Sequence, residues 1–352
     1  MPSSSGPGAA GELGHGYVPL VEVRRGGTVE SVHFGAIAVV DAAGGSVATM
    51  GDPAIPVVLR STAKPVQVLP LLDAGGAERF GFSESEIAVM IGSHGGEPFH
   101  VEAVRSILTK AGLDETALQC GAHAPTHRPA ALELRRLAQE PTALHNNCSG
   151  KHAGMLALAV HLGAPPATYL DPGHPVQARI RARLEGLAGM SPGTAVIAID
   201  GCSAPTFTLS LGNVAMLYAR LAAGTGGDGA PDAALRRAVA AMRHHPEMIA
   251  GTDRLCTELM RRGRGGLVAK IGAEGMYGLA FTREGRAMGI ALKIADGDGQ
   301  RARFSAALEA LSQLGALAPG HAAELGSRFV GELRNHRGLR VGEVITTFQL
   351  AG

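Results

Sequence analysis

The sequence predicts an α+β fold in which one antiparallel-rich sheet is built from both ends of the chain around a helical middle. Three observations support this prediction. Strand-like runs occupy the chain up to residue 60, helix-like segments dominate from 61 to 242, and strand-like runs return between 267 and 294. Strands separated by so long a helical stretch find partners only if distant segments join one sheet.

The opening segment is predicted to be a β-meander. Its strand-like runs are rich in β-branched residues and are separated by turn residues such as those at 43–45. The expected strands cover residues 18–23, 28–40, 46–50 and 57–60.

The middle of the chain is predicted to be mostly helical, beginning at Ser61. A capping box, Ser83 with Glu86 three residues later, marks one helix start. Further helices are expected at 98–111, 129–139, 150–162, 174–187, 211–223 and 233–242, and one buried strand at 194–200 interrupts them. The glycine-rich segment 224–231 matches G-x-G-x-x-G but follows a helix, so it is predicted to be a loop and not a dinucleotide site.

The last part of the chain returns to strands at 267–271, 276–282 and 287–294, followed by a helix at 301–314. These strands are the expected partners of the opening meander.

The charge balance argues against nucleic-acid and membrane partners. The 352 residues include 32 basic and 31 acidic side chains, a net charge of +1, and no apolar run is long enough to span a bilayer. We expect residues 1–16 to be a disordered tail without secretory features and residues 17–352 to form a single catalytic domain in the cytoplasm. The four cysteines are then reduced, available for burial, metal binding or catalysis.

Lysine is rare in this chain. Only five of the 32 basic residues are lysine, at 64, 110, 151, 270 and 293, which leaves 32 − 5 = 27 arginines. Lysine differs from arginine because its ammonium loses a proton readily when buried. Lys64, Lys151 and Lys270 are therefore candidates for chemistry, whereas Lys110 and Lys293 are interpreted as surface lysines.

Ser61 and Lys64 form an S-x-x-K motif where a strand gives way to a helix. A spacing of three puts both side chains on one helical face, and Pro65 is tolerated only in a first turn. The alternative is that Ser61 only caps the helix. Ser93 and the strand residue Lys270 follow, in the motif order of serine β-lactamases and penicillin-binding proteins, which favours catalysis.

Two lone cysteines, Cys148 and Cys202, are either buried inert thiols or metal ligands. Lys151 is close to Cys148 in sequence, but lysine lies outside the usual zinc ligands.

Six sequence blocks resemble the rhizobial-type L-asparaginases, also called the asparaginase II family. They are RSTAKPVQVLPL, IGSHGGEPFH, HNNCSGKHAGMLAL, IDGCSAPTFTLSL, HPEMIAGTDRLC and AKIGAEGMYG, and the similarity covers residues 17 to 350. The resemblance implies a fold akin to serine β-lactamases and glutaminases, a homodimer, and hydrolysis of the L-asparagine side-chain amide.

The resemblance also implies site residues. It pairs Ser61 with Lys64 and Ser93 with Lys270, and it implies Zn²⁺ held by Cys148, Lys151 and Cys202. The match leaves open which serine attacks the amide, and Ser61 is the residue we favour.

Arg60 and Asp200 are candidates for binding the α-carboxylate and the α-ammonium of asparagine, or they form a structural ion pair. Two other functions stay open beside the asparaginase. One is a serine hydrolase of β-lactam or peptide bonds, and the other is a zinc-stabilised binding protein without catalysis.

Overall fold

The computed structural model describes residues 15–350, and within them the predicted α+β architecture is confirmed. Most strands belong to an eight-stranded sheet of order β10-β11-β1-β2-β9-β8-β7, in which β3 pairs with β2. Its strands are β1 (Val18–Arg25), β2 (Thr28–Asp41), β3 (Ser46–Met50), β7 (Val268–Ile271), β8 (Met276–Arg283), β9 (Arg286–Ile294), β10 (Leu333–Arg334) and β11 (Arg340–Thr346).

The two ends of the chain meet in the middle of this sheet. Strands β2 and β9 pair antiparallel, with Ala38 opposite Ala291. A small three-stranded sheet of order β4-β6-β5 lies apart, from β4 (Pro56–Val58), β5 (Val196–Ile199) and β6 (Pro205–Ser210). The prediction of one sheet assembled from distant segments is therefore confirmed.

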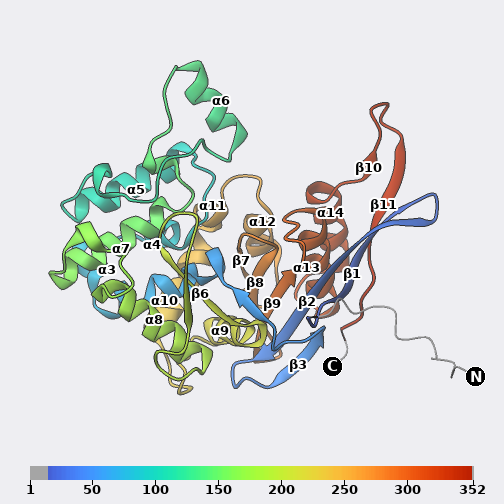
Figure 1. Cartoon of the computed structure of the whole chain (residues 1–352), viewed down its shortest axis with the longest axis horizontal. Helices are drawn as coiled ribbons and strands as arrows, with labels where there is room; N and C mark the ends of the chain where they lie inside the picture. Colours follow the sequence, from blue (N-terminus) through green and yellow to red (C-terminus); the bar gives the residue numbers. More distant parts are fainter. Residues whose placement is uncertain (1–14, 351–352) are drawn as a thin grey trace, which may run out of the picture.

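Helices cover the sheet and form a lobe beside it (Figure 1). The longer ones are α4 (Glu84–Ile91), α5 (Pro98–Lys110), α6 (Arg128–Arg136), α7 (Ser149–Leu162), α8 (Pro175–Ala188), α9 (Leu211–Ala223), α10 (Ala233–His244), α12 (Leu255–Arg262), α13 (Arg301–Gln313) and α14 (Pro319–Phe329). The shorter ones are α1 (Lys64–Gln67), α2 (Leu69–Asp73), α3 (Gly76–Phe80) and α11 (Pro246–Ala250), with 3₁₀ turns at Arg60–Ala63, Glu115–Ala117, Ala143–His145 and Pro166–Thr168.

Helix α9 packs against one face of the sheet. A side chain at Gly278 of β8 would place its Cβ 2.1 Å from Cζ of Tyr218 on α9, so the close approach requires glycine. The opposite face is covered by α13, whose Arg303 guanidinium lies 5.9 Å from the Tyr277 ring. Because Lys270 is opposite Gly278 in the β7–β8 pairing, its side chain is on the α9 face.

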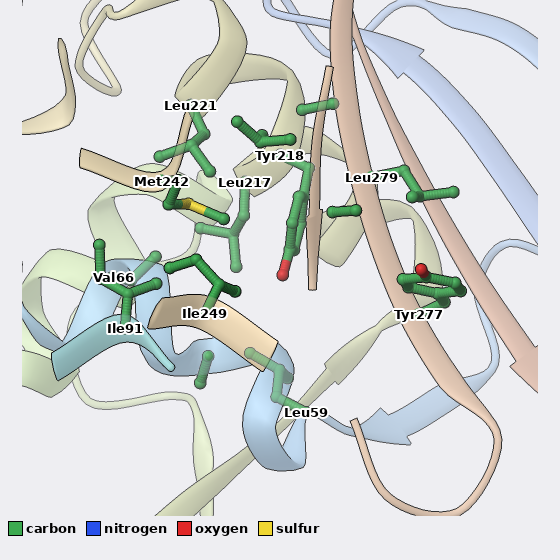
Figure 2. Close-up of a cluster of buried hydrophobic side chains, with 14 of the residues drawn as sticks. Leu59, Val66, Ile91, Leu217, Tyr218, Leu221, Met242, Ile249, Tyr277 and Leu279 are labelled. Atoms are coloured by element: carbon green, nitrogen blue, oxygen red, sulfur yellow. The ribbon is translucent and has the colours of Figure 1, made fainter. Parts of the chain in front are cut away.

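The core between α9 and the helical lobe is apolar and buried. Figure 2 shows this cluster, which includes Leu217 and Tyr218 of α9 and Leu59 ahead of the first 3₁₀ turn. The Tyr218 hydroxyl donates to the carbonyl of Thr62 at 2.9 Å. This contact ties the segment that carries Ser61 and Lys64 to the helix beneath the sheet.

Two local predictions were wrong, and one segment of secondary structure was not predicted. The segment 194–200 forms strand β5, but it is an edge strand, with Val196 and Ile199 64% and 65% exposed. The run at 57–60 joins the small sheet as β4 and not the opening meander. The segment after residue 314 contributes α14, β10 and β11, which the sequence pattern did not predict because their apolar content is low.

The capping box at Ser83 is confirmed, since Ser83 and Glu86 each accept a hydrogen bond from the other's backbone. The loop assignment of 224–231 is also confirmed, because α9 ends just before it. Nearly all of the predicted tail, residues 1–14, lies outside the described residues. No helix among residues 15–350 has the length and apolar character needed to cross a membrane.

Candidate active site

Three segments distant in sequence converge on the hydroxyl of Ser93. Lys64 at the start of α1 donates to Ser93 Oγ at 2.9 Å, and Lys270 of β7 donates to the same oxygen at 2.7 Å. Ser93 lies two residues beyond the last residue of α4, and its own N–H donates to the carbonyl of Ile249 at 2.8 Å. The arrangement therefore links one serine with two lysines.

Both lysines are buried and held by carbonyl groups. Lys64 is fully buried and donates to the carbonyls of Gly92 at 2.6 Å and Asn147 at 3.2 Å. Lys270 is 1% exposed and donates to the carbonyl of Ile271 at 3.0 Å. Within the described chain, neither lysine has a carboxylate within ion-pair distance.

Burial sets the proton affinity of these lysines. Removal from water disfavours the ammonium and lowers the pKa of Lys64, in part against the attraction of Cys148. Burial, followed by the charge of Lys64, holds the pKa of Lys270 well below its ordinary value. Lysines of this kind can act as neutral bases near neutral pH.

A buried lysine of lowered pKa also destabilises the fold. Below its folded pKa, Lys270 carries a charge that costs more folded than unfolded, and this penalty disappears as the pH rises toward the unfolded pKa of about 10.4. We expect Lys270→Met to raise the free energy of unfolding at pH 7 by about 1 kcal/mol, the usual gain when a functional charge is removed from a core. Urea unfolding at pH 7 and pH 10 checks this: the gain should shrink at pH 10, and a loss of stability at both pH values would contradict it.

Ser61 lies in the 3₁₀ turn that precedes Lys64, half-buried, and its hydroxyl makes no hydrogen bond with any of residues 15–350. The structure thus joins Lys64 to Ser93 and Lys270, and it leaves the predicted partner of Lys64 free. Arg60, directly before Ser61, has a φ of +51°, an uncommon conformation for a residue with a side chain. Such backbone strain occurs often at functional sites.

The two predicted cysteines and Lys151 meet beside these lysines. Lys151 Nζ is 2.9 Å from Cys202 Sγ, and Cys148 and Cys202 share a hydrogen bond. Cys148 precedes α7, which can approach α4 closely only because Gly150 has no side chain, as a Cβ there would lie 2.2 Å from the carbonyl oxygen of Val89. All four cysteines of the chain are unpaired and buried.

The cluster is electrostatically polarised. The hydrogen bond from Cys202, followed by the charges of Lys64 and Lys151, holds the pKa of Cys148 well below its usual value despite burial. Burial alone lowers the pKa of Lys151, but the charges of Cys148, Cys202 and Asp200 outweigh it and raise that pKa. These neighbours favour loss of the Cys148 proton and retention of the Lys151 proton, although in its thiol form Cys148 still donates a hydrogen bond to Asn147.

Arg60 and Asp200 form the structural ion pair that the sequence left as an alternative. Arg60 Nε is 2.6 Å from Asp200 Oδ1, and Asp200 Oδ2 lies 4.0 Å from Lys151 Nζ. The pair occupies only Nε, and in the described part of the chain the two terminal nitrogens of Arg60 make no hydrogen bond. Arg60 therefore retains a free edge that suits a carboxylate.

Sequence reasoning missed several residues around the site. Asn147 Oδ1 accepts from Cys148 Sγ at 3.1 Å, and His94, fully buried, lies 3.0 Å from Ser149 Oγ. His152, also buried, contacts the Tyr169 hydroxyl through Nδ1 at 2.6 Å. Most of these residues could have been found from the sequence, because they lie inside IGSHGG and HNNCSGKH, which belong to the blocks that carry the family resemblance.

Residues 15–350 contain no group of three or more His, Cys, Asp or Glu side chains arranged around a possible metal position. The donors that do converge are two thiols and one lysine amine. Thiolates are preferred zinc ligands, whereas a protonated lysine has no free electron pair to offer.

Three solved structures of low sequence identity are similar to this chain. A protein named Mglu in its native form is 16% identical over 80% of this chain and 65% of its own, with a TM-score of 0.43. A Bacillus glutaminase is 12% identical over 81% of this chain and 92% of its own, with a TM-score of 0.38. A β-lactamase from Mycobacterium bovis is 14% identical over 80% and 95%, with a TM-score of 0.38. This chain thus spans less than two thirds of the length of Mglu.

The sequence has no match among curated proteins. A family model described as L-asparaginase II matches residues 21–346, which include every candidate site residue named above. Membership of that family supports amidohydrolase activity. The chain belongs to the L-asparaginase II family.

Proposed function

We propose that this protein is an L-asparaginase that hydrolyses the side-chain amide of L-asparagine to L-aspartate and ammonia. The observation that carries the proposal is the contact of Ser93 Oγ with two buried lysines, at 2.9 and 2.7 Å, in a member of the L-asparaginase II family. Two buried amines joined by one hydroxyl provide a base and a path for the proton that a neighbouring serine must lose in covalent amide hydrolysis.

In the proposed reaction, Ser61 Oγ attacks the amide carbon. Ser61 suits this role because its hydroxyl is free, whereas Ser93 Oγ is engaged by two amines. Lys64, three residues after Ser61, receives the serine proton, and Ser93 connects Lys64 to Lys270 as a path for that proton. The carbon–nitrogen bond breaks as the leaving nitrogen takes a proton and departs as ammonia. Water then cleaves the acyl-enzyme ester, releasing aspartate and restoring the hydroxyl.

The substrate's charged groups have matching partners beside this serine. The free edge of Arg60 suits the α-carboxylate of asparagine, and Asp200 suits the α-ammonium. The Asp200 side chain is 8% exposed and paired with Arg60, so the α-ammonium of the substrate would join an existing ion pair and would not meet an isolated charge.

The test is ammonia release from a panel of amides. We expect asparagine to be hydrolysed, with glutamine and short amidated peptides as comparison substrates and a chromogenic β-lactam as the probe of the alternative hydrolase. Turnover of the β-lactam without release of ammonia from asparagine would favour the alternative. Metal binding without any turnover would favour a binding protein.

We further propose that Cys148, Lys151 and Cys202 hold one Zn²⁺. The cluster fits the metal in donor type, because the lowered pKa of Cys148 favours a thiolate ligand. Zinc binding would displace the protons of the neighbouring Cys202 and Lys151, so that both could also act as ligands. When bound, zinc supplies polarisation of an oxygen atom of the substrate.

Metal analysis tests this site. We expect about one zinc per chain in the purified protein, lost on Cys202→Ala because a thiolate ligand is removed. Cys256→Ala is the matched control, since Cys256 is also buried but contacts the Tyr277 hydroxyl at 3.2 Å and no other cysteine. Wild-type protein without zinc, after purification in the absence of chelators, would refute the site.

The homodimer and the cytoplasmic location implied by the sequence remain proposals. Size-exclusion chromatography with light scattering measures the first directly.

A further inference from the structure

A second pocket lies on the face of β7 that is opposite the catalytic lysine. It has a volume of about 280 Å³ and is lined by residues that include Arg254, Cys256, Ile271, Gln300, Arg303 and Phe329. Side chains alternate along a strand, so Lys270 is directed to the α9 face and Ile271 to this pocket. The pocket is therefore one strand away from Ser93.

Arg303 is a buried cation without a counterion. Only 6% of it is exposed, and within residues 15–350 no carboxylate lies within ion-pair distance of its guanidinium. Two of its nitrogens donate to carbonyls, of Gly272 at 2.6 Å and Gly299 at 2.5 Å, and Nε has no partner in the described chain. A buried charge is costly unless an opposite charge accompanies it.

Two further features give the pocket positive potential. Arg254 lines the pocket and is likewise without an ion-pair partner among the described residues. Its charge is near enough to Arg303 to act with burial in lowering the pKa of Arg303. Arg254 is also the N-cap of α12, where no side chain caps the first turn, and the first two helical residues, Leu255 and Cys256, line the pocket as well.

The nearby carboxylates are already engaged. Asp253, which also lines the pocket, is paired with Arg328 at 2.5 Å. Asp298 accepts from the backbone N–H of Ala302 at 2.6 Å, at the start of α13. Asp298 still attracts Arg303 from a distance, but among the described residues no carboxylate is in ion-pair contact with either arginine.

We propose that this pocket binds a small oxyanion, a carboxylate or a phosphate, between Arg254, Arg303 and the N-terminus of α12. Two ligands carry an oxyanion that this pocket could bind: inorganic phosphate, and L-aspartate through its carboxylates. Its volume suits a ligand of this size and is below the usual range for larger metabolites.

The pocket is connected to the catalytic strand through the backbone. Arg303 donates to the carbonyl of Gly272, and the preceding carbonyl, that of Ile271, accepts from Lys270 Nζ at 3.0 Å. A bound anion would neutralise Arg303, whose charge lowers the pKa of Lys270. The other groups that face Lys270 are Lys64 from α1, Cys148 ahead of α7 and Cys256 of α12, and Cys256 also lines the pocket beside Arg303.

Isothermal titration calorimetry of the full chain with inorganic phosphate, and separately with L-aspartate, tests the site. We expect at least one of them to bind wild-type protein and to bind Arg254→Gln and Arg303→Gln at least tenfold more weakly, the scale for losing a charge-assisted hydrogen bond. Arg301→Gln is the matched control, because Arg301 lies on the same helix and contacts His33 instead. Arg254→Gln changes a partly exposed side chain, so the test holds even if Arg303→Gln does not fold.

The outcomes distinguish inorganic phosphate from L-aspartate as the ligand, and an anion site from a substrate site or no site. Phosphate binding that depends on Arg254 supports an inorganic anion, and aspartate binding that depends on it supports a product carboxylate. Binding of neither, or equal binding by wild type and Arg254→Gln, overturns the proposal. So does a tenfold rise in KM for asparagine in Arg254→Gln without anion binding, which would assign the pocket to substrate. Calorimetry requires no turnover, so a failure of the proposed asparaginase function leaves the binding result interpretable.

The coupling to Lys270 rests on the proposed function and has its own readout. The bound anion should move the ascending limb of the pH–rate profile to higher pH in wild type and leave Arg303→Gln unmoved. If the anion binds wild-type protein but does not shift its pH–rate profile, the proposed coupling to Lys270 is refuted, whereas the proposed binding site stands.

Discussion

Ser61→Ala should lower kcat for asparagine by about 10⁴-fold or more, because removal of a covalent nucleophile abolishes the acyl-enzyme route. Ser61 is half-buried and makes no side-chain hydrogen bond with the described chain, so the substitution should leave the fold intact. Steady-state ammonia release measures kcat, and circular dichroism checks that the variant is folded. Retention of a tenth of wild-type activity would exclude Ser61 as the nucleophile.

Ser93→Ala separates the two serines. If Ser93 carries the proton between Lys64 and Lys270, its removal should also be severe, and the Ser61/Ser93 double variant should be little worse than the worse single variant. Thr257→Ala is a control for the loss of a buried hydroxyl, since Thr257 bonds to the carbonyl of Gly251 at 2.7 Å, away from the lysines. A trapped acyl group on Ser93 and not on Ser61, seen by mass spectrometry, would exchange their roles.

Local structure was predictable where a few neighbouring residues decide it. The capping box at Ser83 and Glu86 fixes the start of α4, and short continuous apolar runs bounded by turn residues predict β8 and β9. The strand at 194–200 shows the limit of this reasoning. Val196 and Ile199 have strong strand preference, but whether such a strand is central or at an edge depends on its neighbours in the sheet.

The site was predictable in its residue types but not in its contacts. The scarcity of lysine singled out Lys64, Lys151 and Lys270, and all three are buried at the site. The partner of Lys64 could not be predicted in this way, because the i to i+3 spacing that suggests Ser61 is local. The hydrogen bond to Ser93 instead depends on how the segment after α4 is held beside Lys270 of β7 in the folded chain. The pairing of Arg60 with Asp200 is likewise a contact across 140 residues.

The second pocket could not be predicted from the sequence either, because it too depends on contacts between distant segments. Arg303 lies in an ordinary amphipathic helix, and its burial depends on Tyr277, Phe304 and the backbone of Gly272 being around it. A pattern of residues predicts which face of a helix is buried, but not which buried cation lacks a partner.

Lys64→Arg should be as inactive as Lys64→Ala, although it keeps the positive charge. Arginine does not give up its proton in a protein, so it cannot receive one from Ser61. The wild-type pH profile should show the reason. Only a neutral amine accepts a proton, and burial lowers the pKa of both Lys64 and Lys270, so the neutral form is present at lower pH than for a free lysine.

kcat/KM should therefore rise with pH through an apparent pKa below the usual lysine value of about 10.4, and this pKa belongs to the coupled pair. Zinc content measured on the same samples is the control, because loss of metal at low pH would produce a rising limb of its own. Substantial activity of Lys64→Arg with an unshifted profile would show that Lys64 acts only as a fixed charge. The base would then be Lys270, whose amine reaches Ser93 without it.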